Sequence, residues 1–114
     1  MEFHGVDVRT QFKRMRELAP EAYRAFLEFD QKAFKDGALP GKVKELMALA
    51  IAQITQCPWC IQAHTKKAAG AGASDEEIAE TTFVAMAMAA GAAWSHGGLV
   101  LQCLQEHKEQ ASKA

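Results

Sequence analysis

Residues 39–64 read LPGKVKELMALAIAQITQCPWCIQAH, and this stretch predicts two consecutive helices joined by a short turn. In its first half the apolar side chains recur at helical spacing: Val43, Leu46, Met47, Ala50, Ile51 and Ile54. That pattern predicts a helix over 42–55. Pro58 suits the first turn of the next helix, where a missing N–H costs nothing. We therefore expect a second helix over 58–69, ended by Gly70.

The chain before this stretch is also expected to be helical. Apolar residues spaced three apart predict a short amphipathic helix over 7–18. Pro20 fits the first turn of another helix, which we expect to end at Asp36-Gly37, with glycine in a left-handed conformation.

The chain after it carries a clear helix start. Ser74 followed three residues later by Glu77 matches a capping box, which predicts a helix from 75 to about 90. Gly91 or the stretch 95–98 is expected to break it, before a last helix that ends near 109. We expect the tail 110–114 to be frayed.

Composition agrees with a helical domain. In 114 residues, 49% are hydrophobic and 24% charged, enough apolar material for a core, so intrinsic disorder is not expected. Alanine is abundant and no strand-like alternation of period two is visible. We predict an all-α, compact single domain of five to six short helices over residues 1–114. So small a set is not expected to bury all its apolar faces alone, which makes oligomerisation a natural way to cover them.

Charge and hydropathy exclude several partners. The formal net charge of −1 lacks the basic excess typical of nucleic-acid-binding domains. Residues 1–10 are polar and show no secretory signal, and the longest run of low polarity, 83–94, is too short to cross a bilayer. We expect a soluble, cytoplasmic protein with no nucleic-acid or membrane partner.

The cysteines are the feature that composition does not explain. Two of the three, Cys57 and Cys60, form C-x-x-C, and an odd count without a secretory signal argues against a structural disulfide framework. Cysteine reacts as the thiolate, which the positive end of a helix favours at Cys57. His64 lies one turn after Cys60 on the same helical face and can accept its proton. The spacing also lets the two sulfurs join. Cys103 lies among leucines and is expected in the core.

Glu45 is a candidate third member of this group, because it is the one acidic residue in the apolar helix over 42–55. If the chain turns back near 55–58, Glu45 lies roughly 14 Å from the turn and His64 roughly 9 Å, at about 1.5 Å per residue. That arithmetic allows contact without requiring it. The role of Glu45 would be to orient His64 or to accept the proton itself. It could equally pair with the neighbouring Lys42 or Lys44.

Two other interpretations of the cysteine pair stay open. Zinc is the sharper one: Cys57, Cys60 and His64 could bind it, with Glu45 or His96 as the fourth ligand. Structural zinc, however, commonly draws on two closely spaced ligand pairs, and only one is present. Thioredoxin-like chemistry is disfavoured because no βαβ pattern surrounds the motif.

With these residues in hand, the chain resembles the carboxymuconolactone decarboxylase superfamily, specifically its AhpD-like alkylhydroperoxidase branch. The family pattern is Glu, eleven residues, Cys-x-x-Cys, three residues and His, and Glu45, Cys57, Cys60 and His64 match it. The similarity covers roughly residues 20–104.

The resemblance implies an all-helical fold that assembles into homo-trimers or homo-hexamers, and a thiol peroxidase activity on hydroperoxides. When the roles of the family's motif are assigned to the matching positions, Cys60 is the nucleophile that attacks the peroxide and Cys57 is the resolving cysteine. His64 and Glu45 then form the proton relay. No metal or other cofactor is implied. A dithiol or a lipoyl-type reductant protein would regenerate the thiols.

One position departs from the family pattern. The best-studied members carry a histidine between the cysteines, where this chain has Trp59. The relay is then shorter, and turnover is expected to be weaker or directed at another substrate. A cofactor-free decarboxylase and a zinc-stabilised, non-catalytic binding protein are the alternatives; the decarboxylase branch generally lacks the cysteine pair.

Overall fold

The computed structural model describes residues 4–5 and 7–113, and within them all regular structure is helical. The five helices in chain order are α1 (Arg9–Leu18), α2 (Pro20–Phe34), α3 (Gly41–Thr55), α4 (Pro58–Gly70) and α5 (Asp75–Lys113). The predicted all-α class is confirmed. The other five residues of the expected domain, Ala114 among them, lie outside this description.

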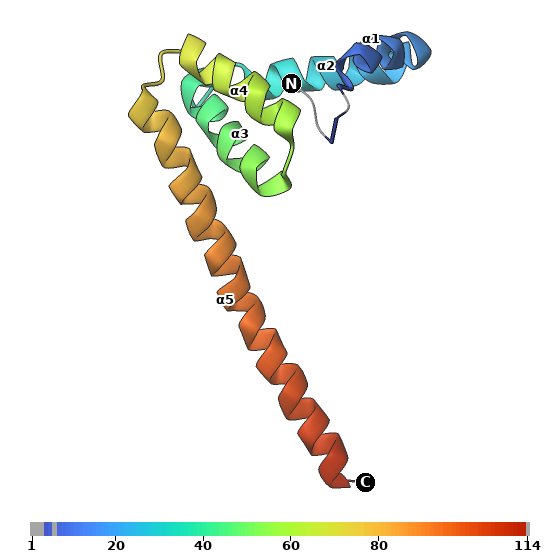
Figure 1. Cartoon of the computed structure of the whole chain (residues 1–114), viewed down its shortest axis with the longest axis vertical. Coiled ribbons are helices and arrows are strands. Elements are labelled where there is room, and N and C mark those ends of the chain that lie inside the picture. The colour runs from blue at the N-terminus through green and yellow to red at the C-terminus, as the bar shows by residue number, and fades with distance from the viewer. Residues whose placement is uncertain (1–3, 6, 114) are drawn as a thin grey trace.

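The centre of the fold is the helical hairpin of α3 and α4, on which the first part of α5 packs (Figure 1). Within the described chain, the buried residues are few and mostly small: Leu49, Ala52, Ala68, Thr81 and Ala85. Because most of them are alanine, the three helices can approach one another closely. Gln53 of α3 adds polar links to α5, donating to Thr81 Oγ1 (3.1 Å) and accepting from Thr82 Oγ1 (2.7 Å).

The connection from α2 to α3 differs from the expectation. Helix α2 ends at Phe34, and Gly37 has no left-handed conformation. Instead the carboxylate of Asp36 accepts a hydrogen bond from the N–H of Gly41 at the start of α3. A Cβ on Gly41 would lie 3.0 Å from Asp36 Oδ1, so the close approach explains the glycine.

The turn from α3 to α4 depends on a left-handed residue that is not glycine. Gln56 has φ 58° and ψ 50°, and its N–H donates to the carbonyl of Ala52. The N–H of Cys57 donates to the same carbonyl at 3.1 Å. This left-handed helix end reverses the chain and brings α4 back along α3.

The capping box at the start of α5 is confirmed. The N–H of Glu77 donates to Ser74 Oγ (3.1 Å), and the N–H of Ser74 donates to Glu77 Oε1 (2.9 Å). Lys42 of α3 also pairs with Glu77, with 2.9 Å between Nζ and Oε2. The Ser74 N–H and the Lys42 ammonium hold the pKa of the Glu77 carboxyl below its usual range.

The expected break in the last part of the chain is wrong. Helix α5 continues for 39 residues through Gly91 and through 95–98, and the predicted frayed segment is helical up to Lys113. A glycine inside a helix costs only about 1 kcal/mol relative to alanine, and the alanines on both sides sustain the helix. His96 is therefore an exposed residue inside the helix rather than at its boundary.

The single chain is also less compact than predicted. Its radius of gyration is 20.3 Å, against about 13 Å for a compact domain of similar length, because most of α5 projects away from the other helices (Figure 1). Cys103 lies on this projecting part and is exposed, so its expected place in the core is wrong.

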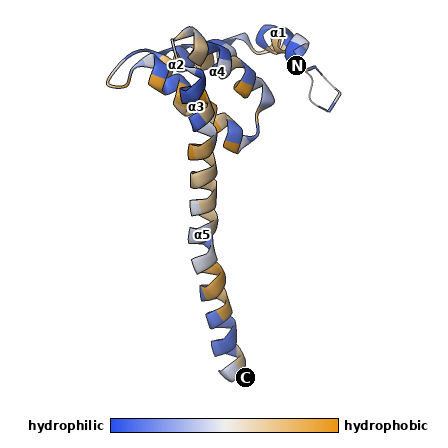
Figure 2. Ribbon diagram, turned by 60° about the vertical axis from the view of Figure 1, so that its left-hand side comes forward, coloured by the Kyte–Doolittle hydropathy of each residue, from blue (hydrophilic) through white to orange (hydrophobic). Residues whose placement is uncertain are grey.

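The continuity of α5 changes one further expectation. By length and composition alone, α5 is the one helix in the described chain that could cross a membrane, with 6% of its most apolar window buried. Figure 2 shows two hydrophobic stretches along α5, separated by a paler stretch near its middle, and hydrophilic residues towards its C-terminal end. The run 83–94 is too short to cross a bilayer only if the helix breaks after it, and α5 does not break there.

Candidate active site

The α3–α4 hairpin carries the four predicted site residues. Cys57 is the residue that caps the start of α4, Cys60 lies in its first turn and His64 one turn further on. Glu45 lies in the second turn of α3. Because α4 runs back along α3, residues 19 apart in sequence become neighbours across the hairpin.

Cys57 and Cys60 are joined by a disulfide, with their Cα atoms 5.2 Å apart. The N–H of Cys60 also donates to Cys57 Sγ at 3.3 Å. An N–H directed at sulfur at the positive end of a helix favours the thiolate once the bond is reduced. This position at a helix start suits a cysteine pair that cycles between a disulfide and a dithiol.

Glu45 and His64 contact each other directly. The distance between Glu45 Oε2 and His64 Nδ1 is 2.6 Å, and the two side chains are only 12% and 17% exposed. A carboxylate only accepts hydrogen bonds, so Nδ1 carries the hydrogen and Nε2 is left free to take a proton. The contact that the helix arithmetic allowed is thus formed, and neither Lys42 nor Lys44 takes the place of His64.

Phe34, at the end of α2, packs against the histidine. Its ring stacks on that of His64, with centroids 5.1 Å apart and 21° between the ring planes. Lys44 holds this end of α2 against α3, because its Nζ donates to the carbonyl oxygen of Lys35 at 2.5 Å. His64 is therefore fixed by a carboxylate at its Nδ1 and by an aromatic ring on its face.

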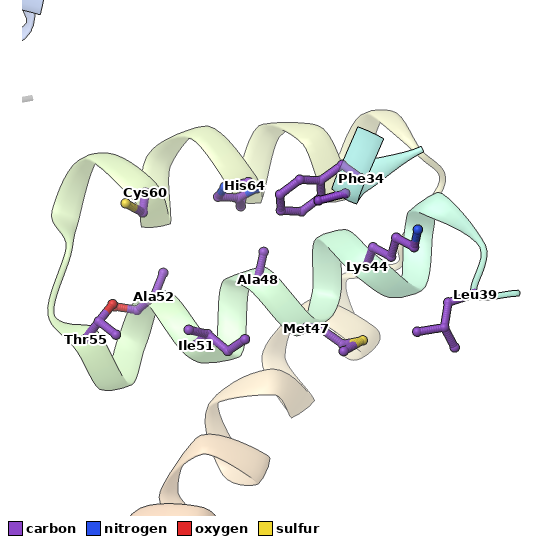
Figure 3. Close-up of a pocket in the computed structure, with 11 residues that line it drawn as sticks. Phe34, Leu39, Lys44, Met47, Ala48, Ile51, Ala52, Thr55, Cys60 and His64 are labelled. Atoms are coloured by element: carbon purple, nitrogen blue, oxygen red, sulfur yellow. The ribbon is translucent and has the colours of Figure 1, made fainter. Parts of the chain in front are cut away.

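A pocket of about 460 Å³ opens beside these groups. Cys60 and His64 form its wall on α4, opposite Ala48, Ile51 and Ala52 of α3 (Figure 3). The lining is almost wholly apolar, with Lys44 and Leu39 at the end away from Cys60. Cys57 does not line it. A molecule bound in this pocket therefore lies next to Cys60 and His64.

Sequence reasoning missed Phe34 and Lys44, and no local signal marks either residue. Phe34 belongs to the apolar stripe of α2, and Lys44 is one of several lysines. Their places depend on how α2 meets α3, which sequence spacing does not report. Trp59 is half-buried between the cysteines and is not among the residues that line the pocket.

The zinc alternative requires several ligands around one point. Among residues 4–5 and 7–113, no group of three or more His, Cys, Asp and Glu side chains could hold a metal ion. The two sulfurs form a disulfide, and Glu45 forms a hydrogen bond with His64. His96, the other candidate ligand, lies on α5.

Comparison with known sequences gives a family match. Residues 20–102 match the carboxymuconolactone decarboxylase family. An uncharacterised protein of the cox locus of Paracoccus denitrificans is 48% identical over 82 residues, covering 72% of this chain and 74% of that protein. An uncharacterised protein of Cupriavidus necator, H16_B0147, is 34% identical over 85 residues, covering 75% of each.

Solved structures show the same fold. The carboxymuconolactone decarboxylase family protein lpg0406 of Legionella pneumophila superposes with a TM-score of 0.68 at 41% identity, covering 72% of this chain and 73% of that one. A family member from Thermotoga maritima, for which an involvement in antioxidative response has been suggested, gives a TM-score of 0.57 at 29% identity, covering 82% and 96%.

Proposed function

Because this chain belongs to the carboxymuconolactone decarboxylase family, we propose that it is a thiol-dependent peroxidase of the AhpD-like branch, which reduces hydroperoxides with its Cys57–Cys60 pair. The observation that carries the proposal is the disulfide whose Cys60 side lines a pocket next to a Glu45–His64 pair. The family and the cysteine pair together agree with a redox function. The peroxidase reaction itself is the proposal.

The reaction begins with the reduced pair. His64 Nε2 takes the proton of the Cys60 thiol, and the thiolate attacks the distal oxygen of the hydroperoxide. A sulfur–oxygen bond forms and the oxygen–oxygen bond breaks, so Cys60 becomes a sulfenic acid and the substrate leaves as an alkoxide. The proton on His64 passes to that alkoxide and gives the alcohol. Glu45 keeps the imidazole oriented and stabilises it while it is charged.

The second half of the reaction restores the disulfide. Cys57 loses its thiol proton and attacks the Cys60 sulfur, so the sulfur–sulfur bond forms and the sulfur–oxygen bond of the sulfenic acid breaks. The leaving hydroxide takes up the proton that Cys57 released and departs as water. An external dithiol, such as a lipoyl-type reductant protein, then reduces the disulfide by exchange. Each cycle converts one hydroperoxide and one dithiol into an alcohol, water and a disulfide. No metal or other cofactor takes part, and such a cycle belongs in a reducing compartment such as the cytoplasm.

The pocket supports an organic hydroperoxide as substrate. Its size lies within the range of roughly 300–1,000 Å³ found for small-molecule sites, and its lining offers an apolar substituent far more contact than hydrogen peroxide can use. Family membership supports assembly into a homo-oligomer, a trimer or a hexamer.

Three cysteine variants test this function. Cys60→Ser is expected to abolish hydroperoxide consumption with a dithiol donor. Cys57→Ser should stop after one turnover and gain one oxygen on Cys60, detected by mass spectrometry with a sulfenic-acid trap. Cys103→Ser is the control and should retain activity, because Cys103 lies on the projecting part of α5. Full activity in Cys60→Ser would refute the proposal.

The same experiment separates the alternatives. A cofactor-free decarboxylase should keep its activity when both cysteines are replaced. A zinc-stabilised binding protein should contain stoichiometric metal and keep its thiols after one equivalent of peroxide, whereas the proposed peroxidase loses two hydrogens at Cys57 and Cys60.

A further inference from the structure

The pocket beside Cys60 carries a permanent charge at one end only. Among the described residues that line it, Lys44 is the one that is always charged, and most of the others are apolar. Figure 3 shows Cys60 and Lys44 at opposite ends of the pocket, with the ammonium of Lys44 directed away from the sulfur. The pocket therefore has a reactive end and a cationic end, with an apolar wall between them.

Helix geometry sets the distance between the two ends. Cys60 lies across the pocket from Ala52 (Figure 3), and Ala52 follows Lys44 by eight residues on α3. At about 1.5 Å per residue, this separation is about 12 Å along the helix. Met47 and Ala48 line the wall over that length. A ligand that contacts both ends must therefore be about 12 Å long and apolar over most of its length.

No carboxylate in the described part of the chain balances the charge of Lys44. Its Nζ donates to the carbonyl oxygen of Lys35, a neutral acceptor, whereas Lys42 on the same helix pairs with Glu77. An ammonium has three N–H donors, so two remain after the bond to Lys35. Because Lys44 is half-buried beside apolar side chains, an anion at this end of the pocket would be attracted more strongly than on an open surface.

We propose that this pocket selects hydroperoxides that carry a carboxylate at the end away from the peroxide group, such as the hydroperoxide of a free fatty acid. The carboxylate accepts hydrogen bonds from Lys44 Nζ, the hydrocarbon chain covers the apolar wall, and the peroxide group lies beside Cys60 and His64. The reaction rests on the proposed function, whereas binding of the acid does not. Each cycle then converts one hydroperoxy acid and one dithiol into the hydroxy acid, water and a disulfide.

Lys44 also has a structural effect, because its bond to the carbonyl of Lys35 holds the end of α2 against α3. A lysine with that effect alone would influence every ligand of the pocket alike. A lysine that binds a carboxylate influences acids and leaves the corresponding esters unchanged. Comparison of an acid with its methyl ester therefore separates the two roles. The ester also represents an acyl chain that is still part of a membrane lipid.

Binding is measured first, without any peroxide. Isothermal titration calorimetry on the disulfide form compares decanoate, whose extended chain is similar in length to the separation of the two ends, with methyl decanoate. Lys44→Met keeps the apolar stem and removes the ammonium. It should weaken the binding of decanoate about tenfold, because a charge-assisted hydrogen bond is lost, and leave the binding of the ester unchanged. Added salt should weaken the binding of decanoate to the unmodified protein and not that of the ester.

Two further variants complete the comparison. Lys44→Arg retains the charge and should keep most of the affinity for decanoate, because a guanidinium also donates to a carboxylate. Lys67→Met is the matched control: Lys67 is an exposed lysine on α4 that does not line this pocket, and its loss changes the net charge by the same amount. It should leave the affinities for decanoate and for the ester unchanged. Circular dichroism checks that all three variants remain helical.

Steady-state kinetics then test the reaction with linoleic acid hydroperoxide, its methyl ester and a dithiol donor. Lys44→Met should raise KM for the acid about tenfold and leave kcat unchanged, because the ammonium lies far from the reacting oxygen and contributes to binding alone. The kinetic constants for the ester should not change.

The outcomes separate this inference from the proposed function. If Lys44→Met weakens acid and ester alike, or changes neither, Lys44 does not recognise a carboxylate and the inference is wrong. If decanoate binds through Lys44 but no hydroperoxide is consumed, the carboxylate site is supported and only the peroxidase reaction is overturned.

Discussion

Replacing Glu45 by glutamine removes the negative charge beside His64 and leaves the shape of the side chain almost unchanged. The two side chains are 2.6 Å apart and mostly buried. A hydrogen bond to a charged group contributes about 1.5–3 kcal/mol, and one between neutral groups about 0.5–1.5 kcal/mol. The difference, about 1–1.5 kcal/mol, corresponds to roughly a tenfold change in rate if it acts while His64 is charged. We therefore expect Glu45→Gln to slow oxidation of Cys60 about tenfold.

The fluorescence of Trp59 offers a direct assay, because this residue lies between the two cysteines. Reduced protein is mixed with cumene hydroperoxide in a stopped-flow instrument, and the second-order rate constant is taken from the concentration dependence of the fast phase. Glu45→Ala should slow the reaction further than Glu45→Gln, because it leaves His64 Nδ1 without its acceptor.

Glu28→Gln is the matched control. Glu28 pairs with Lys32 at 3.0 Å on the surface of α2, where both side chains are more than 60% exposed, and exposed pairs of this kind contribute little. Its rate constant should equal that of the unmodified protein. If Glu45→Gln reacts at the same rate as Glu28→Gln while both remain folded, the Glu45–His64 relay plays no part in the chemistry.

Three further predictions follow from the fold and the pocket. Leu49 is 3% exposed, so Leu49→Ala should lower the free energy of unfolding by about 2–5 kcal/mol in urea titrations; a smaller loss than for the exposed Leu18→Ala would contradict the assigned core. The lowered pKa of Glu77 means that its stabilisation is present above its unfolded pKa and is lost as pH falls through its folded pKa. Between about pH 6 and pH 3, the urea midpoint of Glu77→Gln should therefore change less than that of the unmodified protein, and equal changes would show that the Ser74 and Lys42 contacts do not form. Leu39 lines the pocket away from Cys60, so Leu39→Ser should lower kcat/KM for a long-chain hydroperoxide up to about tenfold and leave hydrogen peroxide unaffected, whereas parallel losses would indicate that the substrate does not occupy the pocket.

Local sequence signals predicted the helix starts and part of the site. The Ser74–Glu77 capping box and Pro58 mark real helix starts because both act through the backbone of their own turn. Helix geometry allowed the contact between Glu45 and His64 to be considered, because both residues lie on one hairpin. Their catalytic roles, like those of the cysteines, stay predictions.

The incorrect predictions concern helix ends and burial, which tertiary contacts determine. Gly91 predicts a break by residue type, but glycine lowers the stability of a helix without ending it. Gln56 adopts the left-handed conformation usual for glycine, so residue type gave no signal for that helix end. Cys103 has the neighbours of a core residue in sequence but lies on a helix that its own chain does not cover.

The paired groups of the candidate site lie close together along the chain, which determines when they form. The disulfide joins residues three apart, and the Glu45–His64 pair joins residues 19 apart. Contacts this local form during folding of the single chain at rates that do not depend on dilution. The two pairs therefore form as soon as the α3–α4 hairpin has folded, whether the protein is abundant or scarce.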